Sequence, residues 1–309
     1  MDVTRKIYAK AKANPKTIVL PEYKDERVVQ AYHFVQKEGI ANVILLTEDK
    51  ILPQEKERYI QEFCEMRKAK GMDIESARKI FEDPLYYAAM MTREGKADGF
   101  VAGASHTTSD VARAAIHCLG VDERINIACS CFIMDVPNCI YGENGVFFFA
   151  DCGIVPEPNP RQLACIALTS AELAIKVLDF VPRIALLSYS THGSAKGKYV
   201  EEIKEALKIL REMSPHIIAD GELQVDAAIV PEVAQIKYPD SILGGKANVL
   251  IFPNLEAGNI SYKLVQRLAN ARAIGPLILG LNKPCSDLSR GCSAEDVIDC
   301  VAVTAIRAQ

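Results

Sequence analysis

The chain has 309 residues, 49% of them hydrophobic, and this length exceeds what one core usually fills, so two domains are expected. The formal net charge of -4, with no run of basic residues, excludes an ordinary nucleic-acid-binding protein. The first residues lack an apolar stretch, and no apolar run is long enough to cross a bilayer. We therefore expect a soluble cytoplasmic protein that binds neither membranes nor nucleic acid.

The cysteines and histidines do not form a pattern typical of a metal site. Ten cysteines are scattered along the chain without a C-x-x-C pair, and the five histidines show no H-x-x-x-H spacing. Several cysteines lie in apolar runs, where a thiol packs as a small hydrophobic group. We expect buried thiols in a reducing compartment and no metal.

Short apolar runs alternate with longer amphipathic segments almost throughout the chain. The runs typical of strands are KTIVL (16–20), ANVILL (41–46), ADGFVAG (97–103), CSCFIMDV (129–136), RIALLS (183–188), NVLIF (248–252) and PLILGL (276–281). The segments typical of helices span residues 27–39, 160–178, 198–213 and 259–271. Residues 141–155 indicate instead a local hairpin or an antiparallel edge. The alternation predicts an α/β fold with mainly parallel strands.

No low-complexity linker divides the chain, so the domain boundaries are inferred from the order of the elements. We place the first domain at residues 1–125 plus 282–309 and the second at 126–281, so that the last helix returns to the first domain. In open α/β sheets, ligands bind beyond the carboxyl ends of strands, often where two domains meet. Chemistry is therefore expected in the loops that follow strands.

The loop at residues 103–113 has the features of a capped helix start. Thr107 and Asp110 fit a capping box, which explains both residues without any function. Arg113 lies one turn further along, where an arginine either faces a bound anion or remains an ordinary surface residue.

A second capping box, Ser293 with Asp296, follows directly after Ser289-Arg290-Gly291. A cation and a flexible residue beside a helix N-terminus suit an anion site. A turn and a cap without any chemistry explain the same residues equally well.

The loop at residues 188–202 precedes a long helix and is rich in small residues, namely Ser190, Thr191, Gly193 and Ser194. Free backbone N–H groups at a helix start favour a phosphate-bearing ligand. The loop is not a P-loop, because Tyr199 stands where Ser or Thr would hold Mg²⁺. A further loop, residues 253–263, predicts a turn at 256–259 that leads into a helix.

Taken together, these loops resemble those of the phosphate acetyltransferase (phosphotransacetylase) family, within the wider phosphate acetyl/butyryl transferases. The resemblance runs nearly end to end. The blocks that carry it include LPEYKDERVVQA, DGFVAGASHTTSDVAR, LLSYSTHGSAKGK, DGELQVDAAIVPEVA and GLNKPCSDLSRGCSAEDVID. One departure is TEDKILPQEKERYIQ, which looks shorter than the matching region of many relatives.

The resemblance implies a reversible reaction, in which acetyl-CoA and phosphate give acetyl phosphate and CoA. It implies two α/β domains with mainly parallel sheets, of the isocitrate/isopropylmalate dehydrogenase type, with the active site in the interdomain cleft. It also implies a homodimer, with CoA as a substrate and no permanently bound cofactor. The family positions that match are Asp296, Ser289 and Arg290 for catalysis and Arg113, Arg67, Arg290 and Gly291 for substrate binding. Arg67 rests on the resemblance alone.

In this interpretation Asp296 takes the proton from the CoA thiol while Ser289 orients the thiol. The three arginines neutralise the acyl phosphate or the oxyanion. A ping-pong route through Cys292 or Cys139 is the alternative to direct transfer, which we favour. The competing functions are phosphate butyryltransferase, a non-catalytic CoA or acyl-phosphate sensor, and a decarboxylating dehydrogenase, for which neither a dinucleotide motif nor a carboxylate metal cluster is found.

Overall fold

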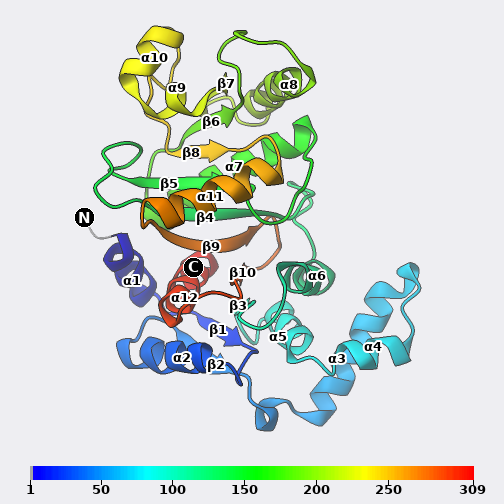
Figure 1. Ribbon diagram of the computed structural model, residues 1–309. Coiled ribbons are helices and arrows are strands. Elements are labelled where there is room, and N and C mark those ends of the chain that lie inside the picture. The colour runs from blue at the N-terminus through cyan, green and yellow to red at the C-terminus, as the bar shows by residue number, and fades with distance from the viewer. Residues whose placement is uncertain (1–2) are drawn as a thin grey trace. The chain divides into compact units, whose positions relative to one another are not determined.

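The computed structural model describes residues 3–309, which separate into two compact units (Figure 1). Unit 1 comprises Met1–Glu123 and Leu281–Gln309, and unit 2 comprises Arg124–Gly280. Unit 2 is therefore one continuous segment, whereas unit 1 joins two segments that are remote in the sequence. Within residues 3–309, no helix is long and apolar enough to span a bilayer.

Unit 1 is built on four parallel strands in the order β2-β1-β3-β10. They are β1 (Thr17–Leu20), β2 (Asn42–Leu45), β3 (Gly99–Ala102) and β10 (Cys285–Asp287). In the pairing of β10 with β3, Asp287 lies beside Ala102. Because all four strands run in the same direction, their carboxyl ends meet at one edge, where ligands of α/β sheets bind.

The helices of unit 1 form two groups that both contact these strands. They are α1 (Val3–Ala13), α2 (Glu26–Glu38), α3 (Pro53–Arg67), α4 (Ile74–Ile80), α5 (Pro84–Arg93), α6 (Thr108–Leu119) and α12 (Ala294–Ala308), with short 3₁₀ turns η1 (Glu48–Lys50) and η2 (Lys68–Lys70). One group has α12 packed on α1 and α2, and the other has α5 packed on α6, while α3 packs on α4 and α5.

Unit 2 has six strands in the order β9-β4-β5-β8-β6-β7. They are β4 (Cys129–Asp135), β5 (Val146–Ala150), β6 (Arg183–Leu187), β7 (Ile218–Leu223), β8 (Val249–Ile251) and β9 (Arg272–Leu279). Only β4 is antiparallel to its neighbours, β5 and β9, and the remaining pairs are parallel. Residues 141–155 contain only one strand, β5, and its antiparallel partner β4 lies before this range, so the predicted hairpin begins earlier in the chain than expected. The edge alternative is wrong, because β5 also pairs with β8.

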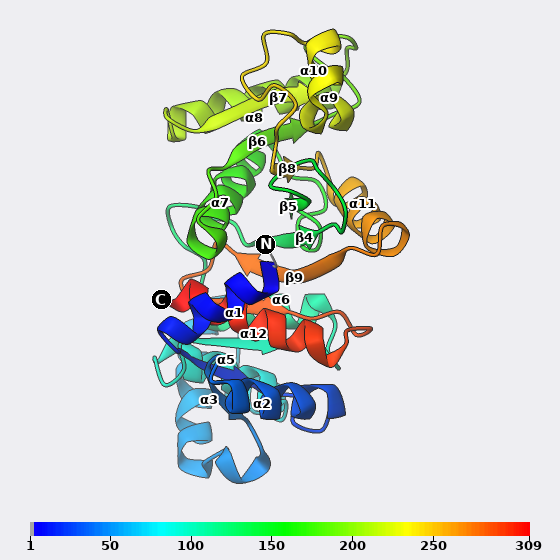
Figure 2. The same ribbon diagram turned by 90° about the vertical axis from the view of Figure 1, so that its left-hand side faces the viewer.

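The helices of unit 2 are α7 (Pro160–Leu178), α8 (Lys198–Met213), α9 (Val225–Ile229), α10 (Pro231–Lys237) and α11 (Leu255–Leu268). Figure 2 shows α7 and α11 on opposite sides of the strands. The predicted turn at residues 256–259 is wrong, because α11 already begins at Leu255 with Asn254 as its N-cap. Position 258, inside this helix, requires glycine because an added Cβ would lie 2.1 Å from the carbonyl oxygen of Asp151.

The apolar-run pattern does not predict β7 or β10, and it starts β9 too late. Both missed strands carry buried acidic residues, Asp220 and Glu222 in β7 and Asp287 in β10. Asp220 accepts a hydrogen bond from the hydroxyl of Ser241 at 2.7 Å, so burial of its polar group is partly compensated. Strands of this kind do not show the continuous hydrophobic run on which the prediction relied.

Candidate active site

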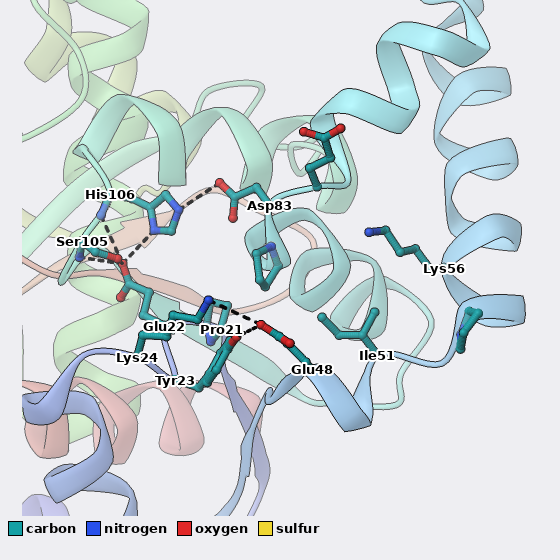
Figure 3. A pocket seen from close by; sticks show the side chains of 13 residues that line it. Pro21, Glu22, Tyr23, Lys24, Glu48, Ile51, Lys56, Asp83, Ser105 and His106 are labelled. Atoms are coloured by element: carbon teal, nitrogen blue, oxygen red, sulfur yellow. Dashed lines mark hydrogen bonds and ion pairs between the residues drawn. The ribbon is translucent and has the colours of Figure 1, made fainter.

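The loops after β1 and β3 are joined by the buried carboxylate of Glu22 (Figure 3). Glu22 accepts hydrogen bonds from the backbone N–H groups of Gly103 and Ala104 at 3.0 and 2.9 Å. It also accepts from the backbone N–H groups of Ser105 and His106 at 2.7 and 3.1 Å, and from the Ser105 hydroxyl at 2.9 Å. Burial alone would raise the pKa of this carboxyl, but the hydrogen bonds from His106 and the loop hold it below its ordinary value. An ionised carboxylate therefore fixes the start of the β3–α6 loop.

His106 bridges Glu22 to the N-terminus of α5. Its Nδ1 lies 2.7 Å from Glu22 Oε1, and its Nε2 lies 2.9 Å from Asp83 Oδ2. The hydrogen bond to Asp83, and then the one to Glu22, raise the pKa of His106 to about 10. The ring is therefore an imidazolium at neutral pH, donating to both carboxylates. Figure 3 shows this chain of contacts along one wall of a cavity of about 530 Å³.

Arg27, in the first turn of α2, connects this loop to the residues after β10. Its Nη1 donates to the carbonyl oxygens of Arg290 and Cys292 at 2.8 and 2.9 Å. Its Nη2 donates to the carbonyl oxygen of Ala104 at 2.9 Å. Nε and Nη2 also donate to the carboxylate of Asp25 at 2.9 and 2.6 Å. The β3–α6 loop and the segment after β10 are thus held to one guanidinium.

The segment Ser289-Arg290-Gly291 forms an exposed turn between β10 and α12. The Ser289 carbonyl accepts from the Cys292 N–H at 2.9 Å, and its hydroxyl accepts from the Gly291 N–H at 3.3 Å. A side chain placed on Gly291 would meet only the Ser289 hydroxyl, at 3.8 Å. Packing within the chain therefore does not require glycine here, and the space beside its backbone is open to a ligand.

The predicted capping box at the start of α12 is confirmed. The Ser293 hydroxyl accepts from the Asp296 N–H at 3.2 Å, and the Asp296 carboxylate accepts from the Ser293 N–H at 2.8 Å. The box of Thr107 and Asp110 at the start of α6 is confirmed in the same way. Asp296 is partly exposed and lies in the first turn of α12, six positions after Arg290, so the three predicted catalytic residues lie within the junction between β10 and the first turn of α12.

Asp287, the last residue of β10, carries a carboxylate that the sequence does not single out. It is fully buried, and within residues 3–309 neither of its carboxylate oxygens accepts a hydrogen bond. Burial raises its pKa to about 7, and the nearby Thr108 hydroxyl and Leu288 N–H oppose the rise. Gly103 packs directly on this group, since a side chain there would lie 2.3 Å from Asp287 Oδ1.

Arg67 contacts the imidazole of His117, and the charge of Arg113 also acts on this ring. Arg67, at the end of α3, lies 3.0 Å from His117 Nε2 through its Nη2, and Arg113 is one turn before His117 on α6. Burial, and then the charges of Arg67 and Arg113, lower the pKa of His117. Arg113 is largely exposed and also pairs with Asp110 at 3.1 Å. Two cations therefore share one region of α3 and α6, beside a neutral histidine.

The small residues predicted for phosphate binding lie in unit 2, in the loop between β6 and α8. The Ser190 hydroxyl and the Gly193 N–H donate to the buried carboxylate of Glu222 at 2.9 and 2.7 Å. The Thr191 N–H donates to the Ser194 hydroxyl at 2.9 Å. Two of the groups expected to bind phosphate thus donate to the Glu222 carboxylate instead. Gly197, the N-cap of α8, provides no side-chain cap for that helix.

Comparison with known proteins identifies the family. The family model described as "Phosphate acetyl/butaryl transferase" matches residues 2–305. The chain is 46% identical to the phosphate acetyltransferase of Thermoanaerobacterium thermosaccharolyticum, with 100% of both chains covered. The aligned region spans 328 positions, so this chain carries gaps relative to that protein.

Solved structures give the same result. A phosphotransacetylase from Streptococcus pyogenes has a TM-score of 0.90 at 38% identity, covering 99% of this chain and 98% of that chain. A putative 4-hydroxythreonine-4-phosphate dehydrogenase from Salmonella typhimurium, with a TM-score of 0.50 and 11% identity over 96% of this chain and 100% of that chain, shares the fold alone. The predicted α/β class is confirmed. The chain belongs to the phosphate acetyl/butyryl transferase family.

Proposed function

We propose that this chain is a phosphate acetyltransferase, which transfers an acetyl group reversibly between CoA and phosphate. The observation that carries the proposal is its 46% identity, over the whole length of both chains, to a phosphate acetyltransferase. We propose units 1 and 2 as the two domains of this enzyme. All ten cysteines are free, which suits a reducing cytoplasm.

In the proposed reaction the CoA sulfur attacks the carbonyl carbon of acetyl phosphate. By analogy with cysteine, the thiol has a pKa near ~8.5, so it is mostly protonated at neutral pH and a base is needed. Asp296 takes that proton as the carbon–sulfur bond forms, and Ser289 orients the thiol. The carbon–oxygen bond to phosphate then breaks, and phosphate leaves with the electron pair. Arg290 stabilises the oxyanion and the departing phosphate.

Direct transfer is supported by the state of Cys292, the thiol nearest to this junction. Burial raises the pKa of Cys292 to about 11, with a smaller opposing effect from Arg27. A thiol that stays protonated at neutral pH is a poor nucleophile. A ping-pong route through Cys292 is therefore disfavoured.

For substrate binding we propose Arg67 and Arg113 in unit 1 and the β6–α8 loop in unit 2. A planar guanidinium matches phosphate oxygens bidentately, and two of them lie around His117. In the β6–α8 loop, Ser190, Thr191, Gly193 and Ser194 shape the backbone around Glu222. A phosphate group would use the uncapped start of α8 beside this loop.

An acyl-transfer assay tests the proposal, following acyl-CoA formation from CoA with acetyl phosphate or butyryl phosphate. Because the matching family model covers both acyl groups, faster turnover of butyryl phosphate would assign the chain to the butyryl branch. In Asp296→Asn the amide oxygen can still accept from the Ser293 N–H, so the cap is kept while the base is lost. We expect kcat to fall by about 10²–10⁴-fold in this variant. The neighbouring Glu295→Gln is the matched control, and equal activity of both variants would remove Asp296 as the base.

We also propose a homodimer that forms through α11. Ile260, Leu264 and Leu268 are spaced four residues apart and are 58%, 53% and 80% exposed. On another face of the same helix, Tyr262 stacks on Phe132 at 4.2 Å between ring centroids. An exposed aliphatic stripe of this kind marks an interaction surface. Light scattering should give the mass of a dimer for the wild type and of a monomer for Leu264→Glu, and a dimer in both would refute this surface.

A further inference from the structure

The guanidinium of Arg27 has no donor left for a substrate. An arginine side chain carries five N–H donors in a rigid fork. Here the five donations go to the carbonyl oxygens of Ala104, Arg290 and Cys292 and to the carboxylate of Asp25. The side chain is 31% exposed, so it lies at the edge of the site rather than inside a core. Because all of its N–H donors are used within the protein, Arg27 differs from Arg67, Arg113 and Arg290, which we propose to bind substrate.

We propose that Arg27 is a positioning residue for the acetyl transfer, an inference that rests on the proposed function. It holds the backbone on both sides of Gly291, through the carbonyls of Arg290 and Cys292, against the β3–α6 loop. Ser289 and Arg290 then project from a turn whose backbone is fixed. The start of α12, which carries Asp296, is fixed with it. Arg27 acts on the reaction only through this backbone.

The geometry requires arginine rather than a positive charge alone. Lysine has three donors on one nitrogen and no planar fork, so it cannot span two loops and the Asp25 carboxylate together. Asp25 has a double role, because it orients the guanidinium and also caps α2 by accepting from the Arg27 N–H at 2.9 Å. Removing its charge while keeping its oxygen therefore weakens the clamp without removing the cap.

The test compares Arg27→Lys with Arg78→Lys, in which an exposed arginine paired with Glu57 undergoes the same change. We expect kcat of Arg27→Lys to fall by about 10–100-fold with the KM values for CoA and acetyl phosphate within about threefold of wild type, because a displaced catalytic group loses rate more than binding. Arg78→Lys should keep both constants. An unchanged kcat overturns the proposal, and so does a raised KM for CoA at constant kcat, which would mean direct substrate contact.

Amide hydrogen exchange gives a readout that does not depend on activity. In Arg27→Lys, the amides of residues 103–106 and 288–293 should exchange faster, while exchange in unit 2 should stay unchanged. Absence of acetyl transfer by the wild type would refute the proposed function, and the exchange experiment would still decide the role of Arg27. If Arg27→Lys does not fold, Asp25→Asn serves instead. It should show the same local acceleration, and unchanged exchange in it would overturn the clamp.

Discussion

His106 and Glu22 lie 2.7 Å apart, from Nδ1 to Oε1, and share a proton that the fold retains far above neutral pH. The pKa of His106 is raised to about 10, first by Asp83 and then by Glu22. The unfolded histidine has a pKa near ~6.5. Its contribution to stability is therefore fully present below pH ~6.5 and is lost as the pH rises through about 10.

His106→Gln should consequently destabilise the protein most at low pH. We expect the free energy of unfolding to fall by about 2–3 kcal/mol at pH 6, because a charged hydrogen-bonded bridge is removed. The difference from wild type should shrink steadily toward pH 10. Urea unfolding at pH 6, 8 and 10 measures it, with the exposed His216→Gln as control. A difference that stays constant with pH would show that His106 is not charged in the folded state.

Asp287→Asn should stabilise the protein at neutral and alkaline pH. The folded pKa of about 7 lies above the unfolded value of ~3.9, so folding favours the neutral carboxyl. The stability that Asp287 gives is full below pH ~4 and is lost as the pH rises through about 7. The variant should therefore gain roughly 2–4 kcal/mol over wild type at pH 8 and little at pH 4. A variant that is less stable at pH 8 would mean that the carboxylate has a partner worth more than its burial costs.

Gly103→Ala should be among the most damaging single-atom additions to unit 1. The new methyl would lie 2.3 Å from Asp287 Oδ1 and 2.5 Å from the backbone of Leu288, at a φ of +118°. We expect a loss of about 3 kcal/mol or more, since both the clash and the strained backbone must be relieved. Gly39→Ala is the matched control, because its φ is +67° with open space around it, and it should cost about 1 kcal/mol. Thermal unfolding of both variants gives the comparison, and equal losses would contradict it.

Arg67→Gln should weaken binding of phosphate-bearing substrates and also change the titration of His117. We expect KM for CoA or acetyl phosphate to rise by about 10–100-fold, as one charge-assisted contact is lost. Because the charge of Arg67 helps to lower the pKa of His117, that pKa should rise in the variant. NMR titration of the imidazole follows the second effect, and Arg78→Gln is the control for both. A raised KM with an unchanged His117 pKa would place Arg67 away from the ring when substrate is absent.

The sequence patterns predict much of the fold because local rules decide it. Residues 160–178 and 198–213 form helices with the predicted bounds, and both predicted capping boxes are present. These features depend on spacing over a few residues, which a single sequence displays directly. The resemblance to the family adds the proposed catalytic residues Ser289, Arg290 and Asp296.

The residues that organise the site were not predictable in the same way. Glu22, Arg27 and His106 look like ordinary surface residues in the sequence, and their roles depend on partners about 80 to 265 positions away. Asp287 is hidden for a different reason, because its three-residue strand is too short and too polar to show periodicity. Pairwise contacts between remote loops leave no local signal, so only the folded structure identifies them.

The division of unit 1 into two remote segments sets the order in which the protein can assemble on the ribosome. The fourth strand and α12 of this unit are synthesised last, after all of unit 2. Helix α12 is then held to the beginning of the chain, since Tyr8 donates to Asp299 at 2.8 Å. It is also held to β10, since Ser286 shares a hydrogen bond of 2.6 Å with Thr304. A nascent chain that stalls before Cys285 already holds a complete unit 2, but it has a three-stranded unit 1 and lacks the turn at residues 289–291. The turn that we propose for catalysis is therefore completed only after all of unit 2 has been synthesised.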